Sequence, residues 1–292
     1  MRRCSFCVLA VAVLSLSLGL TSCSGNLSAS NKASSTSPGS SPSTPTPTPT
    51  PAASPAPTPS PTPVASPTPT PVAGTTVLDN VQDTNNWLTC GSCGNSGATG
   101  PAATYSFTPG IASPSEDGSS TEFSIAATVP YTNAYFYLEH TPVTAQMNAL
   151  TYEFDLYIPQ GMEAAPEAIE FECQQVFSGW VYNFGWQALY SGGIWRIFDY
   201  GLKQWDATTV AFAGFTPGTW HHILAEYHND ITNHIVYHDA LTVDGVRNPV
   251  NVTHNAFNSG GRDQFTNAIQ LDSNKSATPY SVYVDKMRIT YR

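Results

Sequence analysis

Two glutamates two residues apart, Glu170 and Glu172, are the clearest candidates for chemistry in this chain of 292 residues. On a β-strand, residues i and i+2 share a face and lie about 7 Å apart at Cα. Two carboxyl groups near that separation can hydrolyse a glycosidic bond, one as general acid and the other as base or nucleophile. The pair can also hydrogen-bond a bound sugar or face solvent, so the spacing alone leaves all three interpretations open.

The stretch that carries the pair, residues 167–199, predicts three consecutive strands of a β-meander. In its first strand the glutamates alternate with apolar residues. The second strand has an aromatic stripe over residues 180–190, which we interpret as core because so continuous a stripe is costly to expose. Asn183 and Gln187 then lie on the open face with the glutamates. The alternative is that the stripe lines a groove and stacks on sugar rings.

The third strand of the meander adds two further candidates for ligand binding. Trp195, like Tyr200 and Trp205, lies near loops and strand ends, where an aromatic ring is available to stack on a sugar. Arg196 alternates with Ile194 and Phe198 and is placed to pair with a groove carboxylate. The predicted ligand-binding residues are therefore Glu170, Glu172, Asn183, Gln187, Trp195 and Arg196.

The remaining sequence predicts one all-β domain over residues 74–292, with strand patterns at 149–158, 218–243 and 280–291 and no amphipathic helix. About twelve short strands in a domain of this size favour a two-sheet antiparallel sandwich. Asp244-Gly245 reads as a hairpin turn. A group of histidines in residues 221–238, with Glu226, forms a metal patch if the hairpin pairs His228 with His234. The apolar residues on the opposite parity indicate instead that these histidines face solvent.

Three short motifs resemble concanavalin A-like and laminin-G-like jelly rolls: GTWHHI at 218–223, LTVDGV at 241–246 and the closing YSVYVDKMRITYR. The resemblance covers about the last third of the chain. It implies a jelly roll whose concave sheet binds a polysaccharide in many relatives, although a fold does not by itself give a function. No cofactor is expected, although by analogy with such domains a structural calcium ion could bind near the chain ends, at Asp79, Asp83 and Asp285; isolated acids in turns are more often caps or solvated groups.

The run E-F-E-C-Q-Q at 170–175 also resembles the E-x-D-x-x-E motif of the retaining glucanases on this fold. It departs from that motif where Glu172 replaces the aspartate and Gln175 replaces the final acid. An amide cannot protonate a leaving group, so a hydrolase would need an acid or base from elsewhere, such as Glu153, Asp155 or a histidine. The motif therefore favours a domain that binds rather than cleaves.

The first 73 residues predict export and display. Residues 1–22 have the basic start and short apolar run of a signal peptide, and Leu20-Thr21-Ser22-Cys23 resembles the lipobox of bacterial lipoproteins. That resemblance implies lipidation of Cys23, and Ser24 after it favours the outer membrane; an ordinary signal peptide with an incidental cysteine is the alternative. Residues 23–73 hold 14 of the 24 prolines, which is typical of a disordered stalk rich in proline and threonine.

Charge and cysteine content narrow the partners and the compartment. The net charge is −10 and no basic patch is present in the sequence, which excludes nucleic acid as a probable class of partner and limits membrane contact to the lipid anchor. Cys90 and Cys93 flank a glycine-rich loop and predict a small disulfide, whereas Cys173 reads as a buried apolar residue. A redox pair or half of a zinc site are the alternatives for Cys90 and Cys93.

Together these patterns predict a lipoprotein on the bacterial cell surface, with the outer membrane favoured, that carries a lectin-like jelly roll and binds polysaccharide or another extracellular glycan. The first alternative is a glycoside hydrolase or polysaccharide lyase on the same fold. The second is a non-catalytic domain that binds another protein. An enzyme requires two titrating groups in one cleft, whereas a lectin requires exposed aromatic side chains there.

Overall fold

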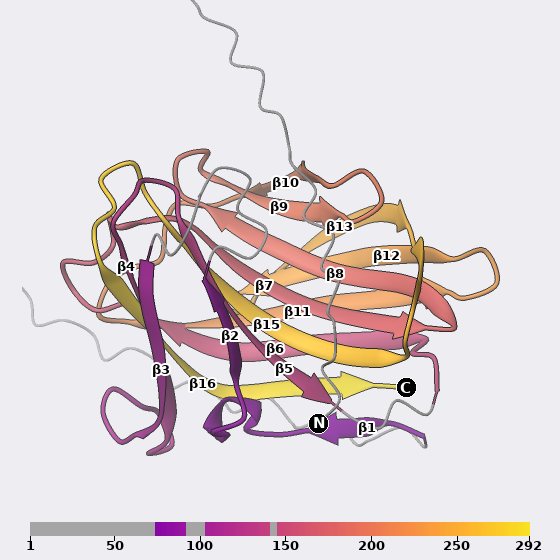
Figure 1. Ribbon diagram of the computed structural model, residues 1–292, viewed down its shortest axis with the longest axis horizontal. Coiled ribbons are helices and arrows are strands. Elements are labelled where there is room, and N and C mark those ends of the chain that lie inside the picture. Colours follow the sequence, from indigo (N-terminus) through magenta and orange to yellow (C-terminus); the bar gives the residue numbers. More distant parts are fainter. Residues whose placement is uncertain (1–73, 92–102, 141–144) are drawn as a thin grey trace, which may run out of the picture. The chain divides into compact units, whose positions relative to one another are not determined.

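Alternating apolar and polar residues build two antiparallel sheets that pack face to face, as Figure 1 shows. The computed structural model describes residues 74–91, 103–140 and 145–292. The predicted all-β, two-sheet sandwich is confirmed by this architecture. The predicted signal peptide, the lipidated Cys23 and the stalk lie outside the described residues, as do Cys93 and the side chain of Cys90, so the disulfide remains a prediction.

One layer, which we call the β16 sheet, has Tyr280–Tyr291 near its middle. Its strands are, in spatial order, β13 (Val246–Asn255), β12 (Ile235–Val243), β11 (Trp220–Asp230), β6 (Ala149–Tyr157), β16 (Tyr280–Tyr291), β4 (Ser120–Ala127) and β3 (Ala103–Ile111), with β1 (Thr76–Leu78) paired to β16. A single 3-10 turn, η1 (Val81–Asp83), follows β1. No helix in the described part of the chain has the length and hydropathy needed to cross a bilayer.

The other layer, which we call the β7 sheet, contains the meander that the sequence predicted. Its strands are, in spatial order, β10 (Gln204–Ala211), β9 (Ile194–Asp199), β8 (Gly179–Leu189), β7 (Pro166–Phe177), β15 (Gln264–Ser273), β5 (Asn133–His140) and β2 (Leu88–Gly91), with β14 (Phe257–Gly261) paired to β8. The yellow strands β15 and β16 therefore lie inside their sheets and not at the edges (Figure 1).

The core lies between the two sheets and is rich in aromatic side chains. Tyr182, Phe184 and Trp186 of β8 are at most 1% exposed, so the aromatic stripe forms core as the sequence favoured. Cys173 of β7 is also fully buried. The ring of Phe171 packs against that of Phe154 from the facing sheet, with centroids 4.6 Å apart. Because β7 and β8 bury this side, their polar side chains lie on the opposite face of the sheet.

A β-bulge in β12 determines the side of the sheet on which His238 lies. The register pairs His228 with Tyr237, not with His234, and it shifts between His238 and Ala240. A bulge reverses the alternation beyond it, so His238 points into the core and is 0% exposed. The expectation that this histidine faces solvent is therefore wrong. The proposed metal patch does not form either, because His228 pairs with Asp239 and Glu226 pairs with Arg247.

Candidate functional site

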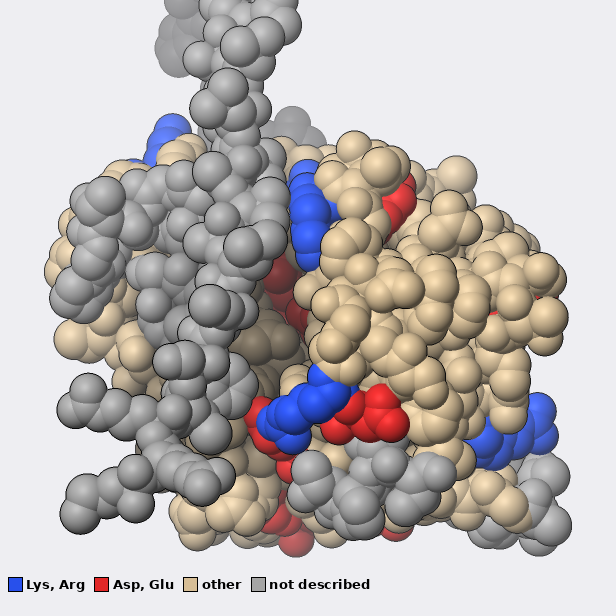
Figure 2. All heavy atoms as spheres, turned by 45° about the vertical axis from the view of Figure 1, so that its right-hand side comes forward, with Lys and Arg blue, Asp and Glu red and all other residues tan. Residues whose placement is uncertain are grey.

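The polar face of the β7 sheet holds a groove of about 560 Å³. Strands β5, β7, β8, β9, β10 and β15 all contribute to its lining. The lining side chains include Glu170, Glu172, Gln187, Arg196, Phe198, Tyr200, Trp205, Gln270 and Asp272. The space-filling view in Figure 2 shows acidic side chains recessed in a hollow with basic side chains near its rim.

Strand register brings most of the predicted binding residues together on the groove floor. Glu170 lies opposite Gln187 on β8, and Gln187 lies opposite Arg196 on β9. The Gln187 amide donates a hydrogen bond of 2.6 Å to Glu170 Oε1 and accepts one of 2.7 Å from Arg196 Nε. These contacts form a continuous polar row across three strands.

A second row positions Glu172. Asn183 Nδ2 donates to Glu172 Oε1 at 2.5 Å, and Gln174 Nε2 donates to the same oxygen at 3.3 Å. Asn183 is 4% exposed and does not line the groove, so it orients the carboxylate and does not itself contact a ligand. The residue opposite Glu172 is Gly185. A Cβ at Gly185 would come within 3.2 Å of Phe198 Cβ, so the glycine leaves room for that ring at the groove floor.

Asp272 of β15 is a third groove carboxyl, and sequence reasoning missed it. Its strand pairs with β7, and Gln270 lies opposite Glu170, so Asp272 lies diagonally beside Glu170 on the same face. Burial raises the pKa of Glu170 well above its ordinary value, and the charge of Asp272 and a hydrogen bond between the two groups raise it further. Burial also raises the pKa of Asp272, to about 6.

These shifts change how the groove carboxyls hold protons. Glu170 and Asp272 are joined by a hydrogen bond and the pKa of each is raised, so the pair holds a proton more readily than two exposed carboxyl groups would. Burial raises the pKa of Glu172 too, while its hydrogen bond from Asn183 opposes that effect. A proton donor next to a proton acceptor is the arrangement on which carboxyl-based acid–base chemistry depends. The groove therefore contains the two titrating groups that an enzyme requires.

The same groups predict how stability depends on pH. A carboxyl group whose pKa is raised by folding adds stability below its unfolded pKa of about 4, and this is lost as pH rises through the folded pKa. We therefore expect the free energy of unfolding to fall as pH rises from about 4 through about 6, the pKa of Asp272, and to fall further as pH rises through the raised pKa of Glu170. Glu170→Gln should reduce that fall, measured by urea unfolding across the range. Glu226→Gln, on the opposite sheet, is the control, and a Glu170→Gln profile parallel to that of the parent would contradict the assignment.

An aromatic wall borders the carboxyl groups at the β9–β10 end of the groove. Trp205 lies opposite Phe198 in the register, and their ring centroids are 5.0 Å apart. Tyr200 packs edge-on against Phe198 at 6.2 Å. Arg196 Cζ lies 5.8 Å from the centre of the Trp205 ring. Tyr200 and Trp205, the stacking candidates predicted with Trp195, both line the groove.

Trp195, by contrast, is not a groove residue, and its predicted role in ligand binding is wrong. It is 1% exposed and packs in the core against Trp186 and Phe212. Adjacent residues of a strand point to opposite faces, so Arg196 in the groove requires Trp195 in the core. Phe198, which shares the parity of Arg196, takes the place on the groove side.

The predicted calcium ligands do not converge on one site. Asp79 forms an ion pair with Arg288, and Asp83 accepts a hydrogen bond from the Ser119 hydroxyl at 2.8 Å. Asp285 is 0% exposed, and its Oδ2 accepts hydrogen bonds from the Ser115 hydroxyl at 2.8 Å and from a backbone N–H at 2.7 Å. These carboxylates connect loops to strands, which is a structural role.

The external acids considered from the sequence also lie elsewhere. Glu153 and Asp155 belong to β6, in the β16 sheet. Asp155 contacts Nδ1 of His222 at 2.7 Å, and hydrogen bonds with Asp155 and Glu153 raise the pKa of this histidine to about 10. This charged cluster is separate from the groove, where Asp272 occupies the place that those acids were expected to fill.

Comparisons with known proteins agree with the sandwich architecture. No family model matches the sequence, and no curated protein is similar to it. A carbohydrate esterase from the Shiga toxin-encoding bacteriophage phi24B has 12% identity and a TM-score of 0.43, over 75% of this chain and 100% of that one. Arcelin-5, a lectin-like defence protein from Phaseolus vulgaris, has 8% identity and a TM-score of 0.39, over 75% and 99% of the two chains.

A family 11 carbohydrate-binding module from Clostridium thermocellum, in complex with a β-1,3-1,4-mixed-linked tetrasaccharide, has 14% identity and a TM-score of 0.36, over 75% of this chain and 96% of that one. Lectin-like and carbohydrate-binding β-sandwich proteins are thus among the structures similar to this chain. Identities this low concern the fold alone, so the function rests on the residues of the groove itself.

Proposed function

We propose that the groove of the β7 sheet binds a glycan. The observation that carries this proposal is the meeting, on one open face, of an aromatic wall with a floor of carboxyl and amide groups. Sugar rings present C–H faces, which pack on aromatic rings, and hydroxyl groups, which need hydrogen-bond partners. Trp205 and Phe198 provide the first kind of contact, and Glu172, Gln187 and Arg196 provide the second.

The charge of the floor favours a neutral or amino sugar over a uronic acid. Glu170, Glu172 and Asp272 all border the groove, and Arg196 is the basic residue among its described lining side chains. The Arg196 guanidinium is already engaged by Gln187. A carboxylated polysaccharide would bring further negative charge next to these acids, and the nearby Lys203 already lies over the Tyr200 ring and interacts with Glu172. In this proposal the chain is held at the cell envelope by a lipid on Cys23, which the sequence motif supports.

A second candidate function is hydrolysis or lytic cleavage of the bound glycan, and the Glu170–Asp272 pair favours it. In hydrolysis, protonated Glu170 would donate its proton to the glycosidic oxygen as the bond to the anomeric carbon breaks. Ionised Glu172, two residues along the same strand, would act as base on a water molecule or as nucleophile, and the water supplies the hydroxyl of the new reducing end. Asp272, which is hydrogen-bonded to Glu170, raises the pKa of Glu170 in the direction that an acid requires.

One set of incubations tests both functions. The full chain is incubated with neutral, amino-sugar and uronic-acid polysaccharides, and retention is measured together with released reducing or unsaturated ends. We expect retention on at least one neutral or amino-sugar polymer and weaker retention on the uronic acids. Glu172→Gln should weaken retention about tenfold, because a carboxylate hydrogen bond typically contributes about 1.5–3 kcal/mol. Glu226→Gln is the matched control on the other sheet.

The outcomes separate the alternatives clearly. Retention without released ends assigns the groove to binding. Released ends that disappear in both Glu170→Gln and Asp272→Asn assign it to cleavage. An absence of retention and of product across the whole panel would contradict the glycan proposal and favour a surface domain that binds another protein.

A further inference from the structure

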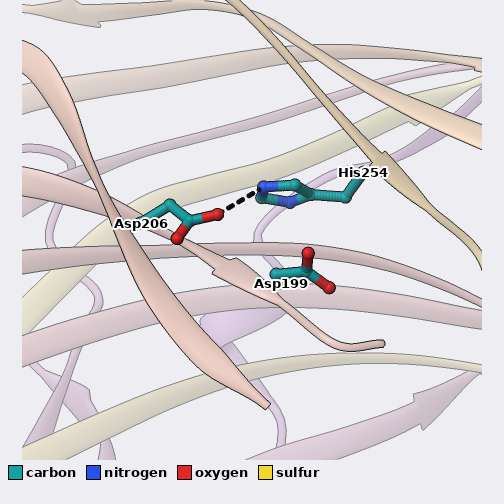
Figure 3. Close-up of side chains that lie close together, drawn as sticks. All are labelled: Asp199, Asp206 and His254. Atoms are coloured by element: carbon teal, nitrogen blue, oxygen red, sulfur yellow. Dashed lines mark hydrogen bonds and ion pairs between the residues drawn. The ribbon is translucent and has the colours of Figure 1, made fainter. Parts of the chain in front are cut away.

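A second polar cluster lies where the edges of the two sheets meet, next to the groove but outside it. Asp199 ends β9, Asp206 is in β10, and His254 is in β13 of the opposite sheet. Each offers one possible ligand atom, and the three atoms lie within 4.8 Å of one another. Figure 3 shows Asp206 approaching the imidazole ring while an oxygen of Asp199 is directed toward it. This cluster is not part of the predicted site or of the proposed glycan-binding residues.

The imidazole of His254 is buried and only half satisfied. Its side chain is 8% exposed, and Nε2 lies 3.1 Å from Asp206 Oδ2. Its Nδ1 is buried and has no hydrogen-bond partner among the described residues. A buried polar atom without a partner costs free energy and is uncommon in native proteins. The contact with Asp206 satisfies Nε2 of His254 and leaves Nδ1 without a partner among the described residues.

A bound cation would satisfy the second nitrogen. Histidines that bind a metal through one ring nitrogen usually donate the other N–H to a carboxylate, and the Nε2 contact with Asp206 has that form. Nδ1 is then free to ligate, with an oxygen of Asp199 as a further donor, while Asp206 holds the ring through Nε2. We propose that Asp199, Asp206 and His254 form a binding site for a divalent transition metal of the zinc type.

The donor set and the location fit this class of ion. One imidazole nitrogen and one oxygen of Asp199 leave two tetrahedral positions for water, and zinc accepts nitrogen and oxygen donors of these kinds. Asp206 is 39% exposed, which provides a route for the ion from solvent. His238 lies behind His254 with ring centroids 5.4 Å apart, and neither of its nitrogens has a partner among the described residues. Two buried imidazoles with unsatisfied nitrogens therefore lie next to each other, His254 at the cluster and His238 further into the core.

A metal ion at this site would connect the two sheets of the sandwich. Asp199 and Asp206 come from the edge of the β7 sheet and His254 from the edge of the β16 sheet. Asp199 follows Phe198 and precedes Tyr200, and Asp206 follows Trp205. An ion held here would link the two sheets and fix the segment that carries the aromatic wall of the groove.

Metal titration of the full chain tests the inference. Thiols are first alkylated with iodoacetamide, because the cysteines would otherwise compete for zinc, and Zn²⁺ is then titrated by calorimetry into chelator-treated protein. We expect about one equivalent bound per chain and a rise in the melting temperature. Asp206→Asn and His254→Gln should each weaken binding by about 10–100-fold. His228→Gln, which alters an exposed histidine–aspartate pair outside the cluster, should leave binding unchanged.

Circular dichroism establishes that each variant is folded before titration, and Asp199→Asn replaces any variant that is not. Failure of the alkylated parent to bind Zn²⁺ would overturn the proposal. So would equal binding by the parent and by all cluster variants, since the ion would then be held elsewhere. Glycan retention is measured separately, so loss of the metal site and failure of the glycan proposal give different results.

Discussion

Trp195→Ala is expected to lower the free energy of unfolding by about 3–5 kcal/mol, because it removes a large side chain from a close-packed core. Trp195 is 1% exposed and contacts four aromatic rings at centroid distances of 5.2–6.4 Å. Its neighbours cannot fill the space without moving β9, which carries the groove side chains on its other face. Urea unfolding followed by circular dichroism measures the effect.

The control is Trp220→Ala, which truncates a partly exposed tryptophan on the outer face of the β16 sheet. Trp220 packs on Tyr157, and its loss should cost only about 1 kcal/mol. If Trp195→Ala were no more destabilising than Trp220→Ala, Trp195 would not be in the core. Its predicted role in ligand binding would then be supported.

Trp205→Ala is expected to show the opposite pattern, with a large loss of glycan binding and a small loss of stability. Truncation of a central aromatic contact typically costs about 2 kcal/mol of binding free energy, which is roughly a 30-fold increase in Kd. Trp205 is partly exposed on the groove side of β10, so its removal leaves the core intact. Affinity electrophoresis with the polysaccharide retained in the panel measures the change, and Trp220→Ala again provides the control.

Two results would contradict this prediction. Unchanged retention in Trp205→Ala would show that the ligand does not contact the aromatic wall. Loss of retention accompanied by unfolding would place Trp205 in the structural core. The conservative variant Trp205→Phe separates the two, because it keeps an aromatic face for stacking and should recover part of the affinity.

The sequence was sufficient to predict the part of the site that depends on local alternation. Glu170, Glu172, Gln187 and Arg196 were expected on one face because period two holds within each strand and across the short turns of the meander. All four line the groove. The error at Trp195 concerns the same alternation. Its neighbour Arg196 is predicted on the groove side, and adjacent residues of a strand cannot share a face.

The rest of the site depends on pairing that no local pattern specifies. Asp272 is far from Glu170 in the sequence, and the two meet because β15 inserts between β7 and β5. The alternation in Gln264–Ser273 was a signal for this strand, but its neighbours are set by long-range packing. To predict the cluster of Asp199, Asp206 and His254, one must know that the edges of the two sheets meet. To predict that His238 is buried, one must know the position of a bulge, which shifts the register without an evident signal in the sequence.

The positions of β15 and β16 also have a consequence for synthesis on the ribosome. These strands are the last of the described chain to be made, yet β15 lies between β7 and β5, and β16 pairs with both β6 and β4. Until residues 264–291 have emerged, five earlier strands (β1, β4, β5, β6 and β7) lack a partner that they have in the folded domain. Unpaired edges of this kind readily pair with other chains. The nascent polypeptide therefore cannot complete either layer until its final strands are available.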